Sequence, residues 1–253
     1  MKSSKPSFKK FQTFIIFTAH RSRPFVVHKS RSRYLILAVL VLLVAGCKKK
    51  PSGAEGKIRF RITYEEGHLG GYSSAVLPRE MIMEFSNEMV KNTIEGGLGF
   101  FSLVNVSDLR NHQNTTWLKF IDKRYIFRGE KHEAPCCFGK LDGMQLAFTD
   151  SIKEIAGLEC RKAIASFPGA EIPPFSIWYT DEIRLPNPNG NSPFRDIPGV
   201  MLEFNTRLGE ANMHMTATGY VPLHISQKQF QAPKNFRPVS REEMDRIMNA
   251  LMN

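Results

Sequence analysis

Short segments in which apolar and polar residues alternate recur through most of the chain. The clearest is residues 57–65, KIRFRITYE, in which Ile58, Phe60, Ile62 and Tyr64 share one side and polar residues occupy the other. Alternation with a period of two, together with β-branched and aromatic residues, predicts a half-buried β-strand. This pattern constrains the fold more than any other feature of the sequence.

Ten further segments of similar character follow at intervals of about ten residues, and Gly, Asn or Asp turn signals separate them. They are EMIMEFSN, MVKNTIEG, GFFSLVNVS, TTWLKFID, RYIFRGE, MQLAFTD, LECRKAIASF, FSIWYTDEI, VMLEFNTR and MHMTATGY. Such spacing is typical of an antiparallel meander. Ten or more strands do not remain flat in one domain, so they curl, split or close. We therefore expect a mainly β fold, with a curved antiparallel sheet or half-barrel.

The C-terminus has a helical pattern instead. Ser240 and Glu243 have the spacing of a capping box. After them, apolar residues recur at intervals of three and four and form one stripe. The stripe consists of Met244, Ile247, Met248 and Leu251. We expect a C-terminal helix that packs on the sheet or covers its concave face.

The N-terminal residues have the organisation of a secretory signal. Basic residues precede a run of twelve mostly aliphatic residues, 34–45, which is too short for a transmembrane helix of about 20 residues. The run leads into Gly46 and Cys47, and this order resembles a bacterial lipobox. We expect residues 1–46 to be a lipoprotein signal peptide with an extended N-terminus, cleaved after Gly46. The alternatives are a secreted protein or an uncleaved anchor with a chance cysteine.

Cys47 would then carry acyl chains such as palmitate. Because each buried methylene contributes about 0.8 kcal/mol, several chains on one residue give a stable membrane anchor. Residues 47–56 are polar and predict a flexible tether, and residues 57–253 predict a single β-rich domain. Position 48 is Lys rather than Asp, which by analogy with lipoprotein sorting favours the periplasmic face of the outer membrane.

Charge argues against nucleic acid as a partner. The formal net charge is +11, but nine of the 35 Lys and Arg residues lie in residues 1–46, which contain none of the 24 Asp and Glu residues. The remaining chain has 26 basic and 24 acidic residues. A nearly balanced body is not expected to follow a phosphate backbone.

Three cysteines follow Cys47. A disulfide between Cys160 and one of the adjacent pair, Cys136 or Cys137, would close a loop of about 24 residues, worth roughly 3 kcal/mol in the chain-entropy model. We take Cys137–Cys160 as the candidate pair, with unpaired thiols as the alternative. A metal site formed by His132 and the three cysteines is another hypothesis. The spacing disfavours it, because zinc sites usually contain C-x2-C pairs. We expect no metal and no cofactor.

Aromatic residues on the predicted strands favour a binding cavity. A curved sheet could line an apolar pocket with such side chains. The candidates are Phe101, Trp117, Phe120, Trp178 and Phe204. The alternative is that these residues only fill the core.

Signatures of catalysis are not found in the sequence. It contains no G-x-S-x-G, no P-loop, no G-x-G-x-x-G and no H-E-x-x-H. We therefore expect a protein that is not an enzyme. The Pro-, Asn- and Gly-rich segment Pro186–Phe194 predicts a protruding loop, which is a candidate contact for a partner.

The C-terminal half, roughly residues 150–250, resembles a family of Bacteroidetes envelope proteins of unknown function. The residues that carry the resemblance are Gly157, Cys160, Arg161, Lys162 and Ala163; Trp178, Tyr179 and Thr180; Ile197, Pro198, Gly199, Glu203 and Phe204; and Phe230, Pro233, Ser240 and Glu243. Val239 replaces the family's usual methionine. The family's strand-rich bodies are similar to the lipoprotein carriers of the Lol system, in which a half-barrel with a helical lid encloses an apolar cavity.

Together these features predict a membrane-anchored lipoprotein that faces the periplasm and binds a lipid or other apolar ligand, or a lipidated protein. The alternative is an envelope assembly or protein-interaction module that has no ligand cavity.

Overall fold

Twelve strands form one sheet in the computed structural model, which describes residues 55–64, 77–96, 99–137, 141, 143–169, 172–209 and 211–252. The strands are β1 (Glu55–Tyr64), β2 (Glu80–Ser86), β3 (Met89–Gly96), β4 (Phe101–Asp108), β5 (Gln113–Phe120), β6 (Lys123–Arg128), β7 (Gln145–Ile155), β8 (Leu158–Ser166), β9 (Phe175–Thr180), β10 (Val200–Leu208), β11 (Ala211–Val221) and β12 (Arg237–Pro238). A 3-10 turn, η2 (Gln227–Phe230), and a helix, α2 (Arg241–Met252), complete the described elements.

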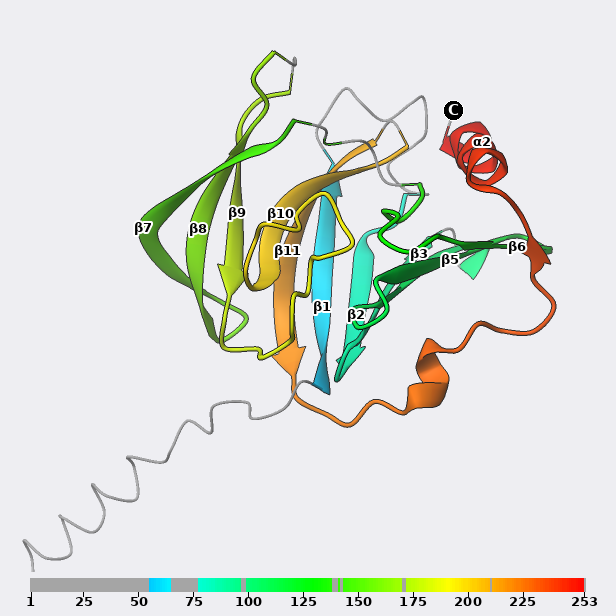
Figure 1. Cartoon of the computed structure of the whole chain (residues 1–253), viewed down its shortest axis with the longest axis horizontal. Helices are drawn as coiled ribbons and strands as arrows, with labels where there is room; N and C mark the ends of the chain where they lie inside the picture. The colour runs from blue at the N-terminus through cyan, green and yellow to red at the C-terminus, as the bar shows by residue number, and fades with distance from the viewer. Residues whose placement is uncertain are drawn as a thin grey trace, which may run out of the picture. The chain divides into compact units, whose positions relative to one another are not determined.

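The sheet consists of two antiparallel meanders joined at its centre. Its order is β12-β6-β5-β4-β3-β2-β1-β11-β10-β9-β8-β7. Strands β1 to β6 are sequential neighbours, as are β7 to β11, and the antiparallel pairing of β1 with β11 links the two sets. Among the described strands, only the short β12 pairs in parallel, with β6. Figure 1 shows the strong curvature of the sheet.

These features confirm the predicted fold class. The described strands form a curved, unclosed antiparallel sheet with one C-terminal helix, and β7 and β12 are its two edges. The first strand begins earlier than predicted, because Glu55 and Gly56, assigned to the tether, belong to β1. The Glu55 carboxylate accepts a hydrogen bond from Ser86 Oγ at 2.9 Å. This contact fastens the start of β1 to the end of β2.

The two faces of the sheet have separate hydrophobic clusters. The larger cluster lies on the inner face, which we define by the side that carries Ile58, Phe60 and Leu103, and it extends to α2. The outer face of β4–β6 has a second cluster. Residues 222–236, which we call the strap, connect β11 to β12 and contribute Ile225 and Phe230 to this second cluster. Strands β4 and β5 are therefore covered on both faces.

Helix α2 has the apolar stripe that the sequence predicts. Met244 and Met248 are buried in the inner cluster, and Ile247 and Leu251 pack against it. Ser240 Oγ accepts a hydrogen bond from the backbone N–H of Glu243 at 3.2 Å, which caps the first turn.

The second half of the predicted capping box is replaced by an ion pair. The Glu243 carboxylate binds Arg237 of β12 at 2.7 Å. This ion pair joins α2 to β12.

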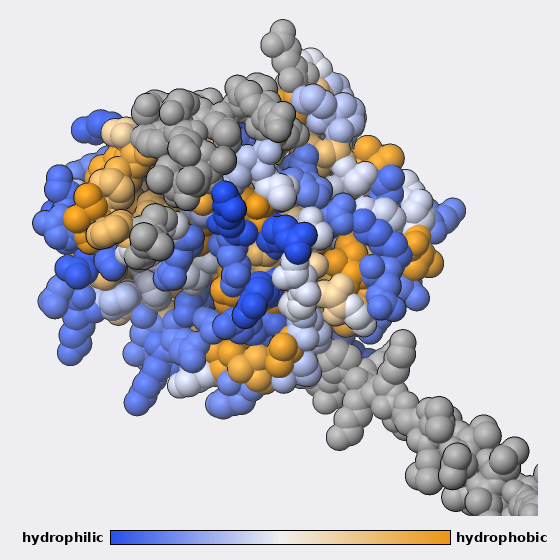
Figure 2. Space-filling view, turned by 180° about the vertical axis from the view of Figure 1, so that it is seen from behind, coloured by the Kyte–Doolittle hydropathy of each residue, from blue (hydrophilic) through white to orange (hydrophobic). Residues whose placement is uncertain are grey.

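The surface in Figure 2 is hydrophilic, with small hydrophobic patches between charged and polar residues. The large exposed apolar side chains include Phe148 and Ile152, which both lie on β7, and Phe100, which precedes β4. None of the described helices has the length and the apolar character needed to cross a membrane.

Candidate functional site

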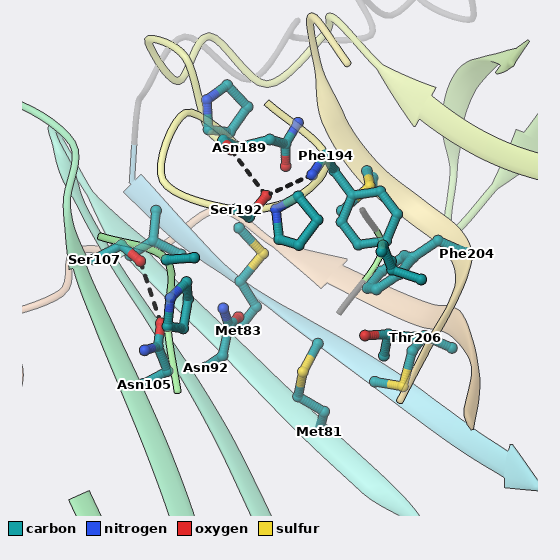
Figure 3. A pocket seen from close by; sticks show the side chains of 18 of the residues that line it. Met81, Met83, Asn92, Asn105, Ser107, Asn189, Ser192, Phe194, Phe204 and Thr206 are labelled. Carbon is teal, nitrogen blue, oxygen red and sulfur yellow. Dashed lines mark hydrogen bonds between the residues drawn. The ribbon is translucent and has the colours of Figure 1, made fainter. Parts of the chain in front are cut away.

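A cavity of about 470 Å³ lies on the inner face of the sheet (Figure 3). Strands β1 to β4, β10 and β11 contribute its walls. The remaining lining comes from the β9–β10 loop (residues 181–199), the segment 133–135, Leu141 and the first residue of α2. The cavity therefore lies where the two meanders meet.

One wall of the cavity is apolar. Its side chains come from four adjacent strands at the centre of the sheet, β2, β1, β11 and β10, and all of them are methionine or phenylalanine. We define the apolar wall as Phe60, Met81, Met83, Met201, Phe204, Met213 and Met215. Because methionine is unbranched and polarisable, such a wall can adapt to apolar ligands of different shape.

Three aromatic rings extend the apolar wall onto the β9–β10 loop. The Phe204 ring meets Phe60 edge to face with centroids 6.1 Å apart, and it meets Phe194 of the loop at 5.8 Å. Edge-to-face pairs stabilise by about 0.5–1.5 kcal/mol beyond their buried area. These contacts hold the loop against the sheet.

The β9–β10 loop is folded on itself by side-chain hydrogen bonds. Asn189 Nδ2 donates to the carbonyl oxygens of Ile197 and Gly199 at 2.9 and 2.8 Å. Ser192 Oγ donates to the carbonyl of Asn189 and accepts from the N–H of Phe194. Residues Asn189 and Phe194 are consequently buried. The prediction that Pro186–Phe194 protrudes is wrong, because the loop folds over the cavity.

Gly199 permits this arrangement where β10 begins. A Cβ at this position would lie 2.3 Å from the carbonyl oxygen of Thr180. Any other residue would therefore separate the end of β9 from the start of β10.

The opposite wall of the cavity is polar, and we define the polar wall as Asn92, Asn105 and Ser107. Asn92 on β3 lies opposite Asn105 on β4, which lies opposite Thr116 on β5. Asn105 Nδ2 donates to Thr116 Oγ1 at 3.2 Å. Ser107 Oγ approaches Asn105 Oδ1 at 3.2 Å and Asn114 Oδ1 at 2.6 Å. Neighbouring strands thus share one polar network.

Asn92 differs from the rest of the network. Its Oδ1 atom is buried and has no hydrogen-bond partner. A buried acceptor without a donor carries an unrecovered desolvation cost of about 1–3 kcal/mol. The side chain of Asn92 therefore holds one buried acceptor whose hydrogen bonding is not satisfied within the described residues.

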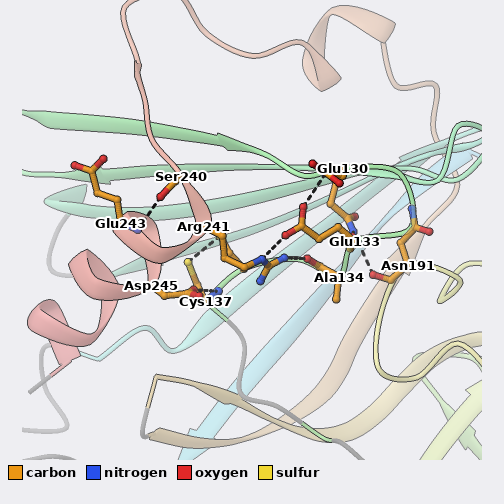
Figure 4. Close-up of polar contacts among 11 residues, drawn as sticks. Glu130, Glu133, Ala134, Cys137, Asn191, Ser240, Arg241, Glu243 and Asp245 are labelled. Carbon is orange, nitrogen blue, oxygen red and sulfur yellow. Dashed lines mark hydrogen bonds and ion pairs between the residues drawn. The ribbon is translucent and has the colours of Figure 1, made fainter.

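The polar network continues to the C-terminal helix through a group of contacts that we call the clasp (Figure 4). Arg241, the first residue of α2, binds the Glu133 carboxylate and donates to the carbonyl oxygen of Ala134. The N–H of Cys137 donates to Asp245 Oδ1 at 3.1 Å. The clasp fixes α2 to the segment 133–137, part of which lines the cavity.

Within the clasp, the charges of Glu133 and Arg241 balance each other. Burial acts to raise the pKa of the Glu133 carboxyl, but hydrogen bonds from Arg241 and from the N–H of Glu130 outweigh it, so the pKa lies below its usual value. Glu133 is therefore ionised beside the Arg241 guanidinium. Among the described residues that line the cavity, these two are the only charged side chains, and they bind each other.

The cysteines are not arranged as the candidate disulfide requires. Cys136, Cys137 and Cys160 are free thiols. Cys160 lies on β8, where its Sγ contacts the carbonyl of Leu158 at 3.5 Å, whereas the Sγ atoms of Cys136 and Cys137 contact each other at 3.1 Å. The described thiols do not form the candidate Cys137–Cys160 bridge: Cys160 lies on β8, whereas Cys137 lies in the segment after β6, against α2.

Two of these cysteines form a small cluster with α2. The ligand atoms of Cys136, Cys137 and Asp245 lie within 4.8 Å of one another. His132 stacks on His112 instead, with ring centroids 4.6 Å apart, and Cys160 is not in the cluster. The sequence-based grouping of His132 with the cysteines is therefore not seen. Burial raises the pKa of the Cys160 thiol to about 11, so this thiol is protonated at neutral pH.

Of the five aromatic residues predicted to line a pocket, Phe204 does so and four do not. Phe101 packs at the edge of the inner cluster, and Phe120 is half-buried at the end of β5. Trp117 lies on the outer face, in the cluster beneath the strap. Trp178 lies on β9 under the ammonium groups of two lysines, Lys153 at 4.2 Å and Lys162 at 5.7 Å.

Sequence reasoning missed most of the cavity. The methionines of EMIMEF and MHM alternate on their strands, so each pair shares one face, and this signal pointed to the apolar wall. The polar wall had a weaker signal, an Asn at position 92 within an otherwise strand-like segment. The lipidation residue Cys47 and the cleavage residue Gly46 lie outside the described residues.

Comparisons with known proteins show the fold alone. No family model matches the sequence, and no curated protein matches it. Among solved structures, two crystal forms of PNGF-II match with a TM-score of 0.50 and 14% identity, over 77% and 78% of this chain and 33% of that chain. This chain therefore spans about a third of PNGF-II. The lipoprotein LppX of Mycobacterium tuberculosis matches with a TM-score of 0.31 and 14% identity, over 75% of this chain and 99% of LppX.

Proposed function

We propose that this protein binds a lipid or another amphiphile in the cavity on the inner face of its sheet, without catalysing a reaction. The observation that carries the proposal is the unfilled volume of about 470 Å³ between an apolar and a polar wall. Protein interiors are packed as densely as organic crystals, and their voids rarely exceed a water molecule. Binding sites for small molecules usually measure about 300–1,000 Å³.

The composition of the lining supports an amphiphile in particular. A hydrocarbon chain would remove the methionines and phenylalanines of the apolar wall from water, at about 25 cal/mol for each Å² buried. The polar wall offers hydrogen bonds at the opposite side of the same cavity. A ligand with one apolar and one polar end matches both walls.

A non-enzymatic role fits the chemistry of the lining. The Glu133 carboxylate is held by Arg241, so among the described residues no free acid or base faces the cavity. Nucleophilic catalysis would need a nucleophile and a base within hydrogen-bond distance of each other. The Ser107 and Ser192 hydroxyls contact amide, carbonyl and N–H groups instead.

The proposal places the protein in the cell envelope, anchored to the outer membrane on its periplasmic face through acylated Cys47. The lipobox-like sequence up to Cys47 supports this location. The nearly neutral charge of residues 47–253 supports a partner other than nucleic acid. The alternative, an interaction module without a cavity, relied on a protruding Pro186–Phe194 loop, and that loop covers the cavity.

Ligand binding is tested on the full chain expressed in a bacterial envelope, extracted with a mild detergent and exchanged into an amphipol, so that no free detergent competes for the cavity. Native mass spectrometry should show a co-purified amphiphile, and a fluorescent fatty acyl probe should bind with one-to-one stoichiometry. The variant Met83→Trp, which fills the cavity, should abolish probe binding. Met89→Trp is the matched control, because Met89 packs against the outer cluster. Equal binding by the two variants would place the ligand elsewhere.

The location is tested separately by mass spectrometry of the N-terminal peptide. We expect a chain that begins at Cys47 and carries acyl groups on it. A chain that begins at Met1, or an unmodified Cys47 thiol, would refute the anchor without affecting the cavity.

A further inference from the structure

We infer that Cys136, Cys137 and Asp245 form a binding site for one Zn²⁺ ion, which fastens helix α2 to the segment that follows β6. None of these three residues lines the cavity, so the metal site is separate from the proposed ligand site. The ion has a structural role, because it holds in place a helix whose first residue, Arg241, borders the cavity.

The three ligand atoms come together from two separate parts of the chain. Cys136 and Cys137 follow β6, and Asp245 lies in the second turn of α2. The two sulfur atoms and a carboxylate oxygen of Asp245 lie within 4.8 Å of one another. Among the residues that the structure describes, this is the only group of three or more His, Cys, Asp or Glu side chains close enough to share a metal ion.

The donor set indicates the kind of ion. Zn²⁺ binds both Cys sulfur, at about 2.3 Å, and carboxylate oxygen, at about 2.0–2.2 Å. Cu⁺ favours soft sulfur ligands, and Mg²⁺ and Ca²⁺ favour oxygen ligands. The three residues supply three of the four tetrahedral positions, and a water molecule takes the fourth. Two thiolates and a carboxylate exceed the charge of Zn²⁺ by one, and Arg241, one turn before Asp245 on the same side of α2, lies close enough to compensate (Figure 4).

The backbone of Cys137 brings the two sulfurs together. Its φ of 73° lies in the left-handed region, which residues other than glycine rarely adopt. The sulfur atoms of the two adjacent cysteines are 3.1 Å apart. Two sulfurs on one tetrahedral Zn²⁺ are about 3.8 Å apart, so they need to separate by only about 0.7 Å. The N–H of Cys137 also donates to Asp245 Oδ1 at 3.1 Å, which holds the carboxylate beside the sulfurs.

A disulfide within the adjacent pair is the competing use of these thiols. The Cα atoms of neighbouring residues are about 3.8 Å apart across a trans peptide bond. Disulfides usually join residues whose Cα atoms are about 4.4–6.8 Å apart. A Cys136–Cys137 bridge would therefore be strained, whereas a metal ion between the two sulfurs needs no such approach.

The burial of the cysteines fits a structural metal site. Cys136 is 0% exposed and Cys137 is 7% exposed. Structural zinc sites are closed, and their ligands bind the ion as the chain folds, so no open path to the folded site is needed. A larger ligand could not reach these atoms.

The test measures the metal content of the full chain. The protein is produced in bacteria grown with added Zn²⁺, extracted with a mild detergent, exchanged into an amphipol and dialysed against metal-free buffer. Inductively coupled plasma mass spectrometry should find about one zinc ion per chain. Less than about a tenth of a zinc ion per chain would overturn the inference. A mass that is lower by two hydrogens, from a Cys136–Cys137 disulfide, would overturn it as well.

Variants and a second metal locate the site. Cys137→Ser should reduce the zinc content at least about tenfold. Cys160→Ser is the matched control and should keep the full content, because Cys160 lies on β8 outside the cluster. Equal zinc contents in the two variants would overturn the inference. Wild-type protein from cells grown with Co²⁺ instead should show sulfur-to-cobalt charge-transfer absorption in the near ultraviolet. Bound cobalt without this absorption would refute the thiolate ligands, even if Cys137→Ser failed to fold.

Discussion

The two walls of the cavity are built by the same kind of strand and stabilised in different ways. The apolar wall is held by packing, and its aromatic rings also attach the β9–β10 loop. The polar wall is held by a network in which each side chain positions the next. Packing tolerates exchange between apolar residues of similar volume, whereas a buried polar network loses stability when one member is removed.

This difference separates two tasks within one cavity. If the protein binds an amphiphile as proposed, an apolar wall rich in methionine would accept tails of many shapes, because contact with hydrocarbon is non-directional. A network with fixed donors and acceptors would select the head group, because an unpaired buried polar atom is costly. Changes to the first wall should therefore affect stability and affinity, and changes to the second should affect selectivity as well.

The largest effect is expected at the apolar wall. Phe204→Ala removes the ring that joins Phe60 and Phe194, and we expect it to lower the free energy of unfolding by about 3 kcal/mol. Urea denaturation measures this change. Phe148→Ala is the control, since Phe148 is 54% exposed, and it should change the free energy by about 0.5 kcal/mol or less. Equal losses of unfolding free energy in the two variants would show that the Phe204 ring does not hold the apolar wall and the β9–β10 loop together.

A smaller effect is expected at the polar wall. Asn105→Leu keeps the approximate volume but leaves Thr116 Oγ1 and Ser107 Oγ without this partner, and we expect a loss of about 2 kcal/mol. Thermal unfolding should show a decrease in Tm of roughly 4–8 °C for a domain of this size. A neutral result would mean that the network contributes nothing to stability, and it would remove the distinction between the two walls.

The alternating pattern located most of the strands, but it did not show what each face of a strand packs against. An alternating pattern of apolar and polar residues identifies a strand. It also shows which face is buried when the other face is exposed to solvent, as in β1. Strands β4 and β5 are covered by the inner cluster on one side and by the strap on the other, so Trp117 and Leu118 are both buried. Periodicity alone could not place Trp117 on the outer face, because the strap is more than 100 residues away in the sequence.

The β9–β10 loop was misjudged for a related reason. Its Pro, Asn and Gly content indicates turns, and this composition correlates with exposure. Asn189 instead satisfies the carbonyl oxygens of Ile197 and Gly199, which allows the loop to be buried. An asparagine can therefore stabilise an exposed turn or hold a buried loop together, depending on which backbone groups lie within hydrogen-bond distance of its side chain.

The clasp at the edge of the polar wall should depend on pH. Because the pKa of Glu133 is lowered in the folded state, its interaction with Arg241 contributes above the unfolded pKa near 4.5 and is lost as the pH falls through the folded pKa. Arg241→Met should lower the free energy of unfolding by about 1 kcal/mol at pH 7, since both side chains are partly exposed. The difference from wild type should shrink below pH 4.5. A difference that is constant from pH 7 to pH 3 would contradict the role of Glu133 ionisation.

The smallest effect is expected from reduction of the protein. A Cys137–Cys160 bridge would link the clasp beside the polar wall to β8 and would stabilise the fold by about 3 kcal/mol, equivalent to a Tm difference of roughly 6–12 °C. Because the three thiols are free, a reductant should change the Tm of the full chain by about 1 °C or less. Denaturation followed by alkylation should label Cys136, Cys137 and Cys160 without prior reduction. A large decrease in Tm on reduction, removed by Cys160→Ser, would mean that a covalent link, and not packing and hydrogen bonding, maintains the cavity.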